Sequence, residues 1–156
     1  MNYCVWESPV GPLLIAGDGE ALHYIYFAKN GKVARPERGW VESATGVVAQ
    51  AVTQLREYFA GKRREFDVPL AVQGTAFQRS VWRALQEIPY GETISYGELA
   101  KRVGNPKASR AAGSANGANR IPIVIPCHRV IAAGGKLGGF GGGLPVKEKL
   151  LALEAR

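Results

Sequence analysis

Hydrophobic residues near the start of the chain follow the pattern of β-strands. Residues 1–28 contain a short apolar run at 13–16 and a segment rich in aromatic and β-branched side chains at 22–27. The Gly-Asp-Gly segment at 17–19, between these two runs, is a hairpin signal. Residues 29–42 contain glycine, proline and scattered charges, and this composition predicts a loop.

The next apolar positions follow the period of a helix. We expect a helix from Ser43 to Ala60, because Gly61 ends a series of apolar side chains at helical spacing: Val47, Val48, Ala51, Leu55 and Phe59. Residues 66–72 predict one more strand, interrupted by Pro69. No group of reactive side chains stands out in this half, so we interpret it as a scaffold made of a small sheet and one helix.

Two helix starts open the second half of the chain. Thr75 begins a capping-box pattern and a helix with one apolar face, formed by Phe77, Val81, Leu85 and Ile88. Ser95 and Glu98 have the spacing of a second capping box, and the short helix that follows closes at Gly104.

A third helix is expected from Pro106 to about Ala115, after the Gly-Asn turn at 104–105. Two short helices joined by such a turn predict a helix-turn-helix. The second helix has one large side chain, Arg110, among small ones: Ala108, Ser109, Ala111, Ala112, Gly113, Ser114 and Ala115. A smooth helix can lie close to a groove of DNA while reading few bases. We therefore expect contact that depends little on base sequence, with Arg110 inserted into the duplex. The alternative is that the small residues only let the helix pack tightly on the core.

Cys127 is the strongest candidate for chemistry. It follows an apolar run at 121–126, which we expect to be extended and buried. Burial raises the pKa of a thiol, but His128 and Arg129 follow at once and can favour the thiolate. A thiol beside a base and a cation suggests a nucleophile. The Cys-His pair taken alone fits a buried structural cysteine equally well.

A glycine-rich segment follows the cysteine. Seven of the ten residues at 134–143 are glycine, and the preceding residues, 130–133, resemble a strand. The segment lacks the Gly-Lys-Ser/Thr ending of a phosphate loop, but it can bring backbone N–H and C=O groups close to a flat ligand. Pro145 then begins a terminal helix whose spacing brings Glu154 within reach of the core, through Val146, Lys149, Leu150, Leu153 and Glu154 itself.

Positive charge is concentrated in the second half. Residues 1–73 carry eight Lys/Arg and eight Asp/Glu, whereas residues 74–156 carry twelve and five, which accounts for the whole net charge of +7. Six basic residues and no acidic one lie within 100–129. This distribution predicts a polyanionic partner, bound mainly through its phosphates if it is DNA.

Composition excludes several classes of protein. No apolar run approaches the roughly 20 residues needed to span a bilayer, and the first residues lack the pattern of a secretory signal. We therefore expect a cytoplasmic protein without a membrane partner. Two cysteines make no disulfide framework. Cys4 and His23 alone are too few for a zinc site, so we expect no metal and no cofactor.

From residue 74 to residue 154 the chain resembles the O6-alkylguanine-DNA alkyltransferases, also called methylated-DNA–protein-cysteine methyltransferases. The Pro-Cys-His-Arg motif at 126–129 is highly specific in this context. Further matching segments are Phe-Gln at 77–78, Val-Trp at 81–82, Tyr-Gly-Glu-Thr-Ile-Ser-Tyr at 90–96, Gly-Asn-Pro-Lys-Ala-Ser-Arg-Ala at 104–111, Gly-Gly-Gly-Leu at 141–144 and Leu-Leu-Ala-Leu-Glu at 150–154. The opening segment at 8–14 is similar to the N-terminal half of bacterial members.

The resemblance implies a catalytic role for four residues. Cys127 would accept the alkyl group directly and irreversibly from O6 of a guanine flipped out of double-stranded DNA. His128 would take the thiol proton through a water, and Glu154 would hold the imidazole. Asn119 matches the asparagine that braces the active-site turn.

The resemblance also implies the DNA-binding residues. Tyr96 would push on the target phosphate and donate toward the base, and Arg110 would fill the gap left in the stack. The helix surface against DNA would consist of Ala108, Ser109, Ala111 and Gly113, and the alkylguanine pocket of Tyr96, Val130, Phe140 and Gly141. The guanine edge would be read by the carbonyls of Cys127 and Val130 and by the amide of Gly141. Many relatives have tyrosine at position 140 and some have serine at 141, so alkyl-group preference stays open.

We therefore expect an α/β (α+β) protein that acts as a monomer. Residues 1–73 would form a ribonuclease-H-like scaffold domain with a small sheet and a helix. Residues 74–156 would form a mostly helical domain that binds DNA and accepts the alkyl group. Two alternatives are a damage-binding alkyltransferase-like protein without transfer, although such proteins have tryptophan in place of Cys127, and a thiol hydrolase, although no oxyanion-hole loop is evident.

Overall fold

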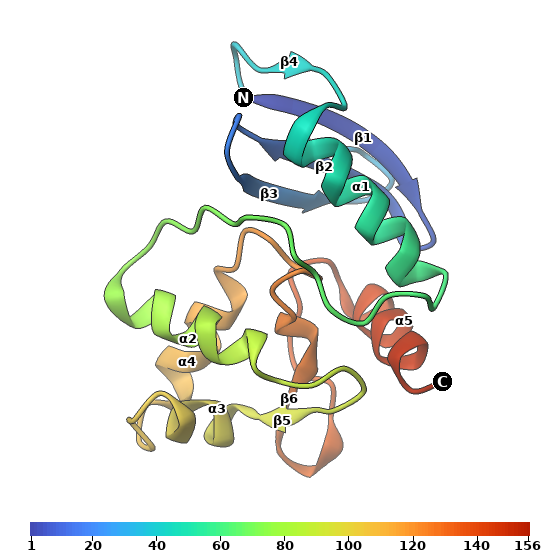
Figure 1. The fold of residues 1–156 in the computed structure, drawn as a ribbon. Coiled ribbons are helices and arrows are strands. Elements are labelled where there is room, and N and C mark those ends of the chain that lie inside the picture. The colour runs from blue at the N-terminus through green and yellow to red at the C-terminus, as the bar shows by residue number, and fades with distance from the viewer. The chain divides into compact units, whose positions relative to one another are not determined.

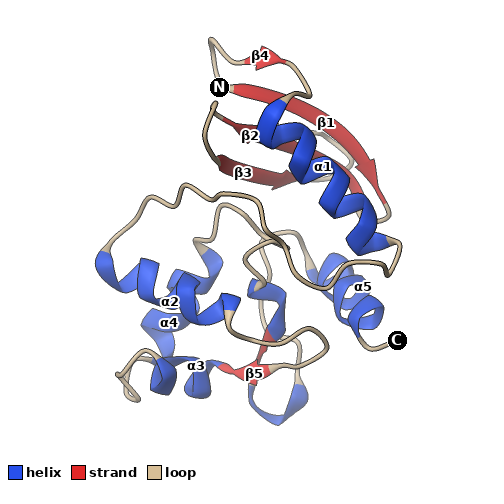
Figure 2. Ribbon diagram, in the orientation of Figure 1, coloured by secondary structure: helices blue, strands red, loops and turns tan.

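The computed structural model describes residues 1–156 and divides them into two compact units, Met1–Val72 and Gln73–Arg156. The first unit is a sheet with one long helix, and the second consists mostly of helices (Figures 1 and 2). The expected α+β class is confirmed.

The first unit contains a four-stranded sheet in the order β3-β2-β1-β4. Its strands are β1 (Asn2–Ser8), β2 (Gly11–Gly17), β3 (Leu22–Phe27) and β4 (Val41–Glu42). β1, β2 and β3 pair antiparallel, whereas β4 pairs in parallel with β1. The strands expected within 1–28 are confirmed. The prediction of a loop at 29–42 is wrong for its last two residues, which form β4.

One helix, α1 (Gly46–Phe59), lies along one face of this sheet (Figure 1). It begins three residues later than expected, after Thr45. The Trp6 ring of β1 meets the Phe59 ring with their centroids 5.9 Å apart. The buried side chains of α1 follow the helical spacing read from the sequence: Val47, Val48, Ala51, Gln54, Leu55 and Tyr58. Apolar burial against the sheet therefore explains where this helix forms.

The strand expected at 66–72 is wrong. Only a single bridge forms there, in which the Leu22 N–H donates to the Pro69 carbonyl (2.8 Å) and the Ala71 N–H donates to the Leu22 carbonyl (2.9 Å). Proline has no N–H to donate, so Pro69 cannot extend this bridge into a ladder.

The second unit contains four helices and a pair of short strands. The helices are α2 (Ala76–Gln86), α3 (Tyr96–Arg102), α4 (Ser109–Gly117) and α5 (Leu144–Glu154). The strands β5 (Ile94–Ser95) and β6 (Val130–Ile131) pair in parallel. Two short 3-10 turns, η1 (Cys127–Arg129) and η2 (Ala133–Gly135), precede and follow β6.

The first capping box is confirmed and the second is half wrong. The Thr75 hydroxyl accepts from the Gln78 N–H (3.1 Å), and the Gln78 amide oxygen accepts from the Thr75 N–H (2.9 Å). The Ser95 hydroxyl likewise accepts from the Glu98 N–H at 3.0 Å. The Glu98 carboxylate instead accepts from the Arg102 Nε at 3.2 Å, since an ion pair one helical turn away attracts it.

α3 and α4 form the expected helix-turn-helix, but α4 begins at Ser109 rather than Pro106. The Ala108 N–H donates to the Asn105 carbonyl (2.9 Å) and closes a turn, and the dihedral angles of Ala108 are not helical. The C-terminal end of α4 is anchored to α2, because the buried Trp82 Nε1 donates to the Ala115 carbonyl at 2.8 Å.

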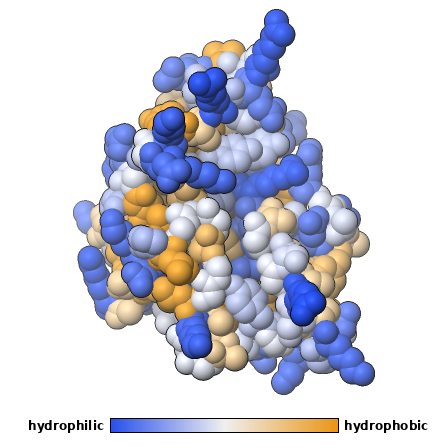
Figure 3. Space-filling view, turned by 180° about the vertical axis from the view of Figure 1, so that it is seen from behind, coloured by the Kyte–Doolittle hydropathy of each residue, from blue (hydrophilic) through white to orange (hydrophobic).

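No helix is both long and apolar enough to cross a membrane. The surface seen in Figure 3 is mostly hydrophilic, with a larger area of hydrophobic residues at the left and smaller ones at the top. Across the chain, the large apolar side chains that are exposed are Met1, Val5, Val33, Val41, Val72 and Leu144.

The two helix N-caps predict unequal effects of the same substitution. Thr75→Ala removes a side-chain cap and should lower the free energy of unfolding by about 1 kcal/mol. Thr45→Ala is the matched control, because the Thr45 side chain caps no backbone N–H of α1, and it should change stability by less than about 0.5 kcal/mol. Urea unfolding followed by circular dichroism measures both. Equal losses would contradict the capping role of Thr75.

Candidate active site

Cys127 is the first residue of η1, and its side chain is only 5% exposed. The apolar run before it is buried, as expected, but it is not extended. The Ile125 N–H donates to the Ile121 carbonyl at 2.9 Å, and Ile123 between them has a φ of 75°. A β-branched residue in the left-handed region costs roughly 1–3 kcal/mol and persists only where its surroundings enforce it. A tight, strained turn therefore leads into the cysteine.

Burial dominates the acidity of the Cys127 thiol. Desolvation raises the pKa of Cys127 from 9.0 to about 11, although a hydrogen bond from Asn119 and the positive charge of Lys147 act in the opposite direction. The thiol is therefore protonated at neutral pH. Its reaction as a nucleophile needs a base that removes the proton.

His128 is the candidate for that base. Its ring is fully buried, and Nε2 lies 2.7 Å from Oε2 of Glu154. A carboxylate accepts hydrogen bonds, so Nε2 carries the hydrogen and Nδ1 is the basic nitrogen. Nδ1 has no hydrogen-bond partner in the protein. Burial lowers the pKa of His128, against the effect of Glu154, and this keeps the imidazole neutral and able to accept a proton.

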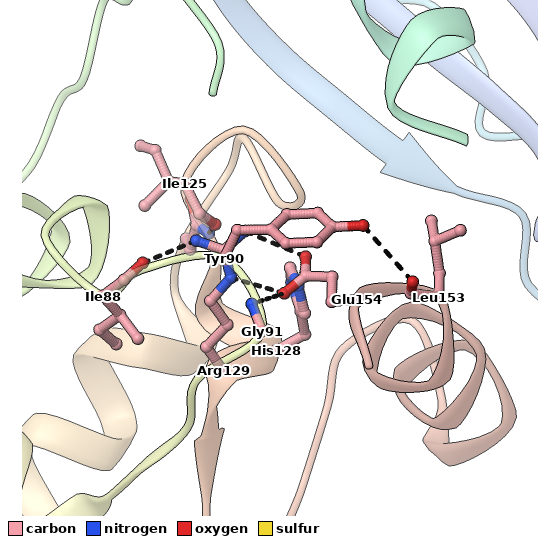
Figure 4. Close-up of polar contacts among 9 residues, drawn as sticks. Ile88, Tyr90, Gly91, Ile125, His128, Arg129, Leu153 and Glu154 are labelled. Carbon is pink, nitrogen blue, oxygen red and sulfur yellow. Dashed lines mark hydrogen bonds and ion pairs between the residues drawn. The ribbon is translucent and has the colours of Figure 1, made fainter. Parts of the chain in front are cut away.

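Arg129 holds the same carboxylate from the other side (Figure 4). Its Nε donates to Oε1 of Glu154 at 2.7 Å and its Nη2 donates to Oε2 at 3.0 Å, while Nη1 donates to the Ile88 carbonyl at 2.7 Å. Two expectations for Arg129 are therefore wrong. The guanidinium is paired with Glu154 rather than with the thiol, and it is buried, so it is not available to DNA phosphates.

Two asparagines brace the turn that carries the thiol. The Asn119 Nδ2 donates to the Ile125 carbonyl at 2.8 Å, and its Oδ1 accepts from the Ile121 N–H at 2.9 Å. Asn119, which we singled out from the sequence, thus closes the strained turn before Cys127. Asn116, which we did not, donates from Nδ2 to the Cys127 carbonyl at 3.3 Å.

A buried lysine ties the glycine-rich segment to this site. Lys147 of α5 is fully buried, and its ammonium donates to the carbonyls of Val130 (2.7 Å), Gly139 (3.2 Å) and Leu137. Desolvation lowers the pKa of Lys147, and a negative charge on Cys127 would raise it. These bonds hold residues 137–139 against β6.

We did not expect Lys147 here, and named the exposed Lys149 of the same helix instead. A signal was present, because Lys147, Leu150 and Glu154 recur at i, i+3 and i+7 and share one helical face. Lysine is usually found at the surface, so its type alone does not indicate burial.

Tyr96, the first residue of α3, lies close to both the thiol and the glycine-rich segment. Burial raises the pKa of Tyr96, and a negative charge on the nearby Cys127 would raise it further. Gly138 has a φ of 73°, and a Cβ on it would lie 3.1 Å from the Tyr96 hydroxyl oxygen. Only glycine allows this approach. Farther along the segment, Phe140 is half-buried and Gly141 is exposed, with room for a side chain.

The residues that we expect to face DNA on and before α4 differ in exposure. Arg110 and Ala111 are exposed, whereas Ala108, Ser109 and Gly113 are half-buried. A Cβ on Gly113 would lie 3.5 Å from the Tyr96 ring, so α4 packs closely on that side chain.

Five of the expected site residues lie in one bonded cluster next to Tyr96: Cys127, His128, Glu154, Asn119 and Val130. No group of three or more His, Cys, Asp or Glu side chains is arranged as a metal site.

Comparisons with known proteins agree along the whole chain. Residues 76–156 match the family "6-O-methylguanine DNA methyltransferase, DNA binding domain", and residues 1–72 match "6-O-methylguanine DNA methyltransferase, ribonuclease-like domain". The chain is 56% identical over 154 residues to a methylated-DNA–protein-cysteine methyltransferase of Methanosarcina acetivorans, covering 99% of this chain and 98% of the relative. A relative of the same name from Mycolicibacterium paratuberculosis is 52% identical over 157 residues, covering 100% and 93%.

A solved structure gives the same result. The crystal structure of Mycobacterium tuberculosis OGT in complex with DNA superposes with a TM-score of 0.91 at 48% identity, covering 99% of this chain and 93% of that one. Both halves of the sequence, the two-part fold and near-complete coverage of these relatives lead to one conclusion: the chain belongs to the 6-O-methylguanine DNA methyltransferase family.

Proposed function

We propose that this protein repairs O6-alkylguanine in double-stranded DNA by transferring the alkyl group to Cys127, once per molecule. One observation carries the proposal. A buried thiol is followed by an imidazole whose Nε2 is bonded to a buried carboxylate and whose Nδ1 has no partner in the protein. This arrangement suits removal of a single proton from the thiol.

The chemistry balances without a cofactor. The sulfur of Cys127 attacks the alkyl carbon as the bond from that carbon to O6 breaks, and the electron pair stays on the guanine oxygen. The thiol proton passes through a water to Nδ1 of His128, and guanine takes up a proton from its surroundings, with Tyr96 as the donor facing it. The product is a thioether, which water does not readily hydrolyse, so each molecule reacts once.

Two buried charged residues, Glu154 and Lys147, would stabilise the charges that form on His128 and Cys127 in this step. Glu154 fixes the tautomer of His128 and stabilises the imidazolium that forms. Lys147 places a positive charge near Cys127 and favours the thiolate. Lys147 also holds the Val130 carbonyl, which keeps a second lone pair for the amino group of guanine. Phe140 and the amide of Gly141 would complete the alkylguanine pocket.

α4 would bind the duplex and open it. A guanine must leave the stack before a buried thiol can reach its O6 atom, which costs a few kcal/mol. Arg110 is exposed on a helix of otherwise small side chains, and its guanidinium would fill the gap. The other exposed basic residues within 100–129, which would face phosphates, are Lys101, Arg102, Lys107 and Arg120.

We assign these roles to residues 74–156, and a scaffold role to residues 1–73. Alkyl transfer needs a reduced thiol, which suits the reducing conditions of the cytoplasm. The protein would work there as a monomer. Nothing in the proposed step requires a metal or a second subunit.

The direct test is the destination of the alkyl group. After reaction with DNA that contains O6-methylguanine, mass spectrometry should find one methyl group per protein, on the peptide that contains Cys127. Cys127→Ala should abolish transfer and retain DNA binding. Methyl groups on Cys4, or more than one turnover per molecule, would contradict the proposal. Binding without any transfer would indicate a damage-binding protein instead.

The raised pKa of Cys127 predicts a loss of stability in alkali. Between its ordinary value of 9.0 and about 11, the unfolded chain has lost the thiol proton while the folded chain keeps it. Stability should therefore fall as pH rises through this window, by on the order of 2 kcal/mol for this group. Urea unfolding at about pH 8 and about pH 10.5 should show a smaller decline for Cys127→Ala than for the unsubstituted protein. Parallel declines would show that the thiol is not desolvated.

Arg110 separates base flipping from chemistry. Arg110→Ala should slow repair of duplex DNA by about tenfold or more, because the emptied stack loses its filler. It should barely change reaction with free O6-benzylguanine if the pocket admits benzyl. His128→Ala is the comparison, and it should slow both reactions, since both need the proton removed. Equal losses on both substrates for Arg110→Ala would make Arg110 a pocket or folding residue.

A further inference from the structure

Asn116 makes an unusual contact with the reactive turn. It is the penultimate residue of α4 and is 5% exposed. Its Nδ2 donates to the Cys127 carbonyl at 3.3 Å. The reverse orientation of the amide would point its oxygen at the carbonyl oxygen, two acceptors facing each other, so the amine faces Cys127.

The other end of this amide is unsatisfied. Oδ1 of Asn116 is buried and has no hydrogen-bond donor in the protein. A buried acceptor without a donor lowers stability, and leucine, of similar size, would avoid that cost. The Cys127 carbonyl would lose little by such a change, because it also accepts from the Val130 N–H. Folding alone therefore does not account for an asparagine here.

Asn116 lies between α4 and the turn that carries Cys127. On one side is α4, whose end is held by the bond from Trp82 to the Ala115 carbonyl and whose first turn carries Arg110. On the other side is the turn of Cys127. The hydrogen bond from Asn116 therefore forms a direct link between α4, the helix that would bind DNA, and the backbone of Cys127.

We propose that Asn116 is a positioning residue, which fixes the backbone of Cys127 relative to α4 so that the thiol meets the alkyl carbon of the flipped base. This inference rests on the proposed alkyl transfer. In-line attack requires close alignment of sulfur and carbon, and a displacement of about 1 Å can slow a reaction roughly 100-fold. Loss of one bracing bond, with Asn119 still in place, should slow transfer about tenfold.

The test compares two buried amides. Asn116→Leu should lower the transfer rate at saturating DNA about tenfold, with an unchanged half-saturating concentration and equal or higher thermal stability. Gln54→Leu is the matched control. Gln54 is 4% exposed in the first unit, and both ends of its amide are bonded to Asp67. That variant should lose stability and keep the transfer rate.

Several results would overturn the proposal. An unchanged rate for Asn116→Leu would do so, as would a rate that falls together with stability and DNA affinity, which is the sign of a structural residue. Asn116→Asp keeps the shape but replaces the donor with an acceptor, and it should slow transfer at least as much. A normal rate for Asn116→Asp would contradict the proposal even if Asn116→Leu failed to fold. No transfer by the unsubstituted protein would instead refute the proposed function.

Discussion

The buried carboxylate of Glu154 organises the second unit. A carboxylate removed from water is costly unless positive and hydrogen-bonding partners surround it. Arg129 supplies the charge through two bonds, and His128 supplies a further N–H. Because Arg129 also donates to the Ile88 carbonyl just after α2, the carboxylate links α5, the cysteine turn and the end of α2. Satisfying one buried charge thereby fixes the imidazole of the residue that follows the thiol.

Burial shifts the acid–base properties of the two neighbouring groups, Cys127 and His128, in opposite directions. Burial raises the pKa of Cys127 and lowers that of His128, so both are neutral at rest. A neutral thiol and a neutral imidazole can exchange a proton without either being charged beforehand. Glu154 and Lys147 then favour the charged pair that results, one from the side of the imidazole and the other from the side of the sulfur.

Lys147 shows how the glycine-rich segment is ordered without regular structure. Glycines lose much conformational entropy when a loop is fixed, so such a segment needs strong bonds to hold it. One ammonium supplies three, to the carbonyls of Val130, Leu137 and Gly139. The same segment contains Gly138, whose lack of a side chain lets Tyr96 lie against it. The position and shape of residues 137–139 thus depend on the buried charge of Lys147.

Local patterns in the sequence determined the helices, the hairpin at 17–19, the Thr75 cap and the candidate thiol, because periodicity and capping act between residues a few positions apart. The family resemblance further indicated His128, Glu154 and Asn119. Only the tertiary structure decided which partners the buried charged and polar side chains bind. Arg129 turns to a carboxylate 25 positions away, Lys147 is buried against backbone carbonyls, and Asn116 meets Cys127 across 11 positions. The reason is physical: the cost of burying a polar group is set by whichever partners the folded chain brings to it, and residue type and spacing do not record them.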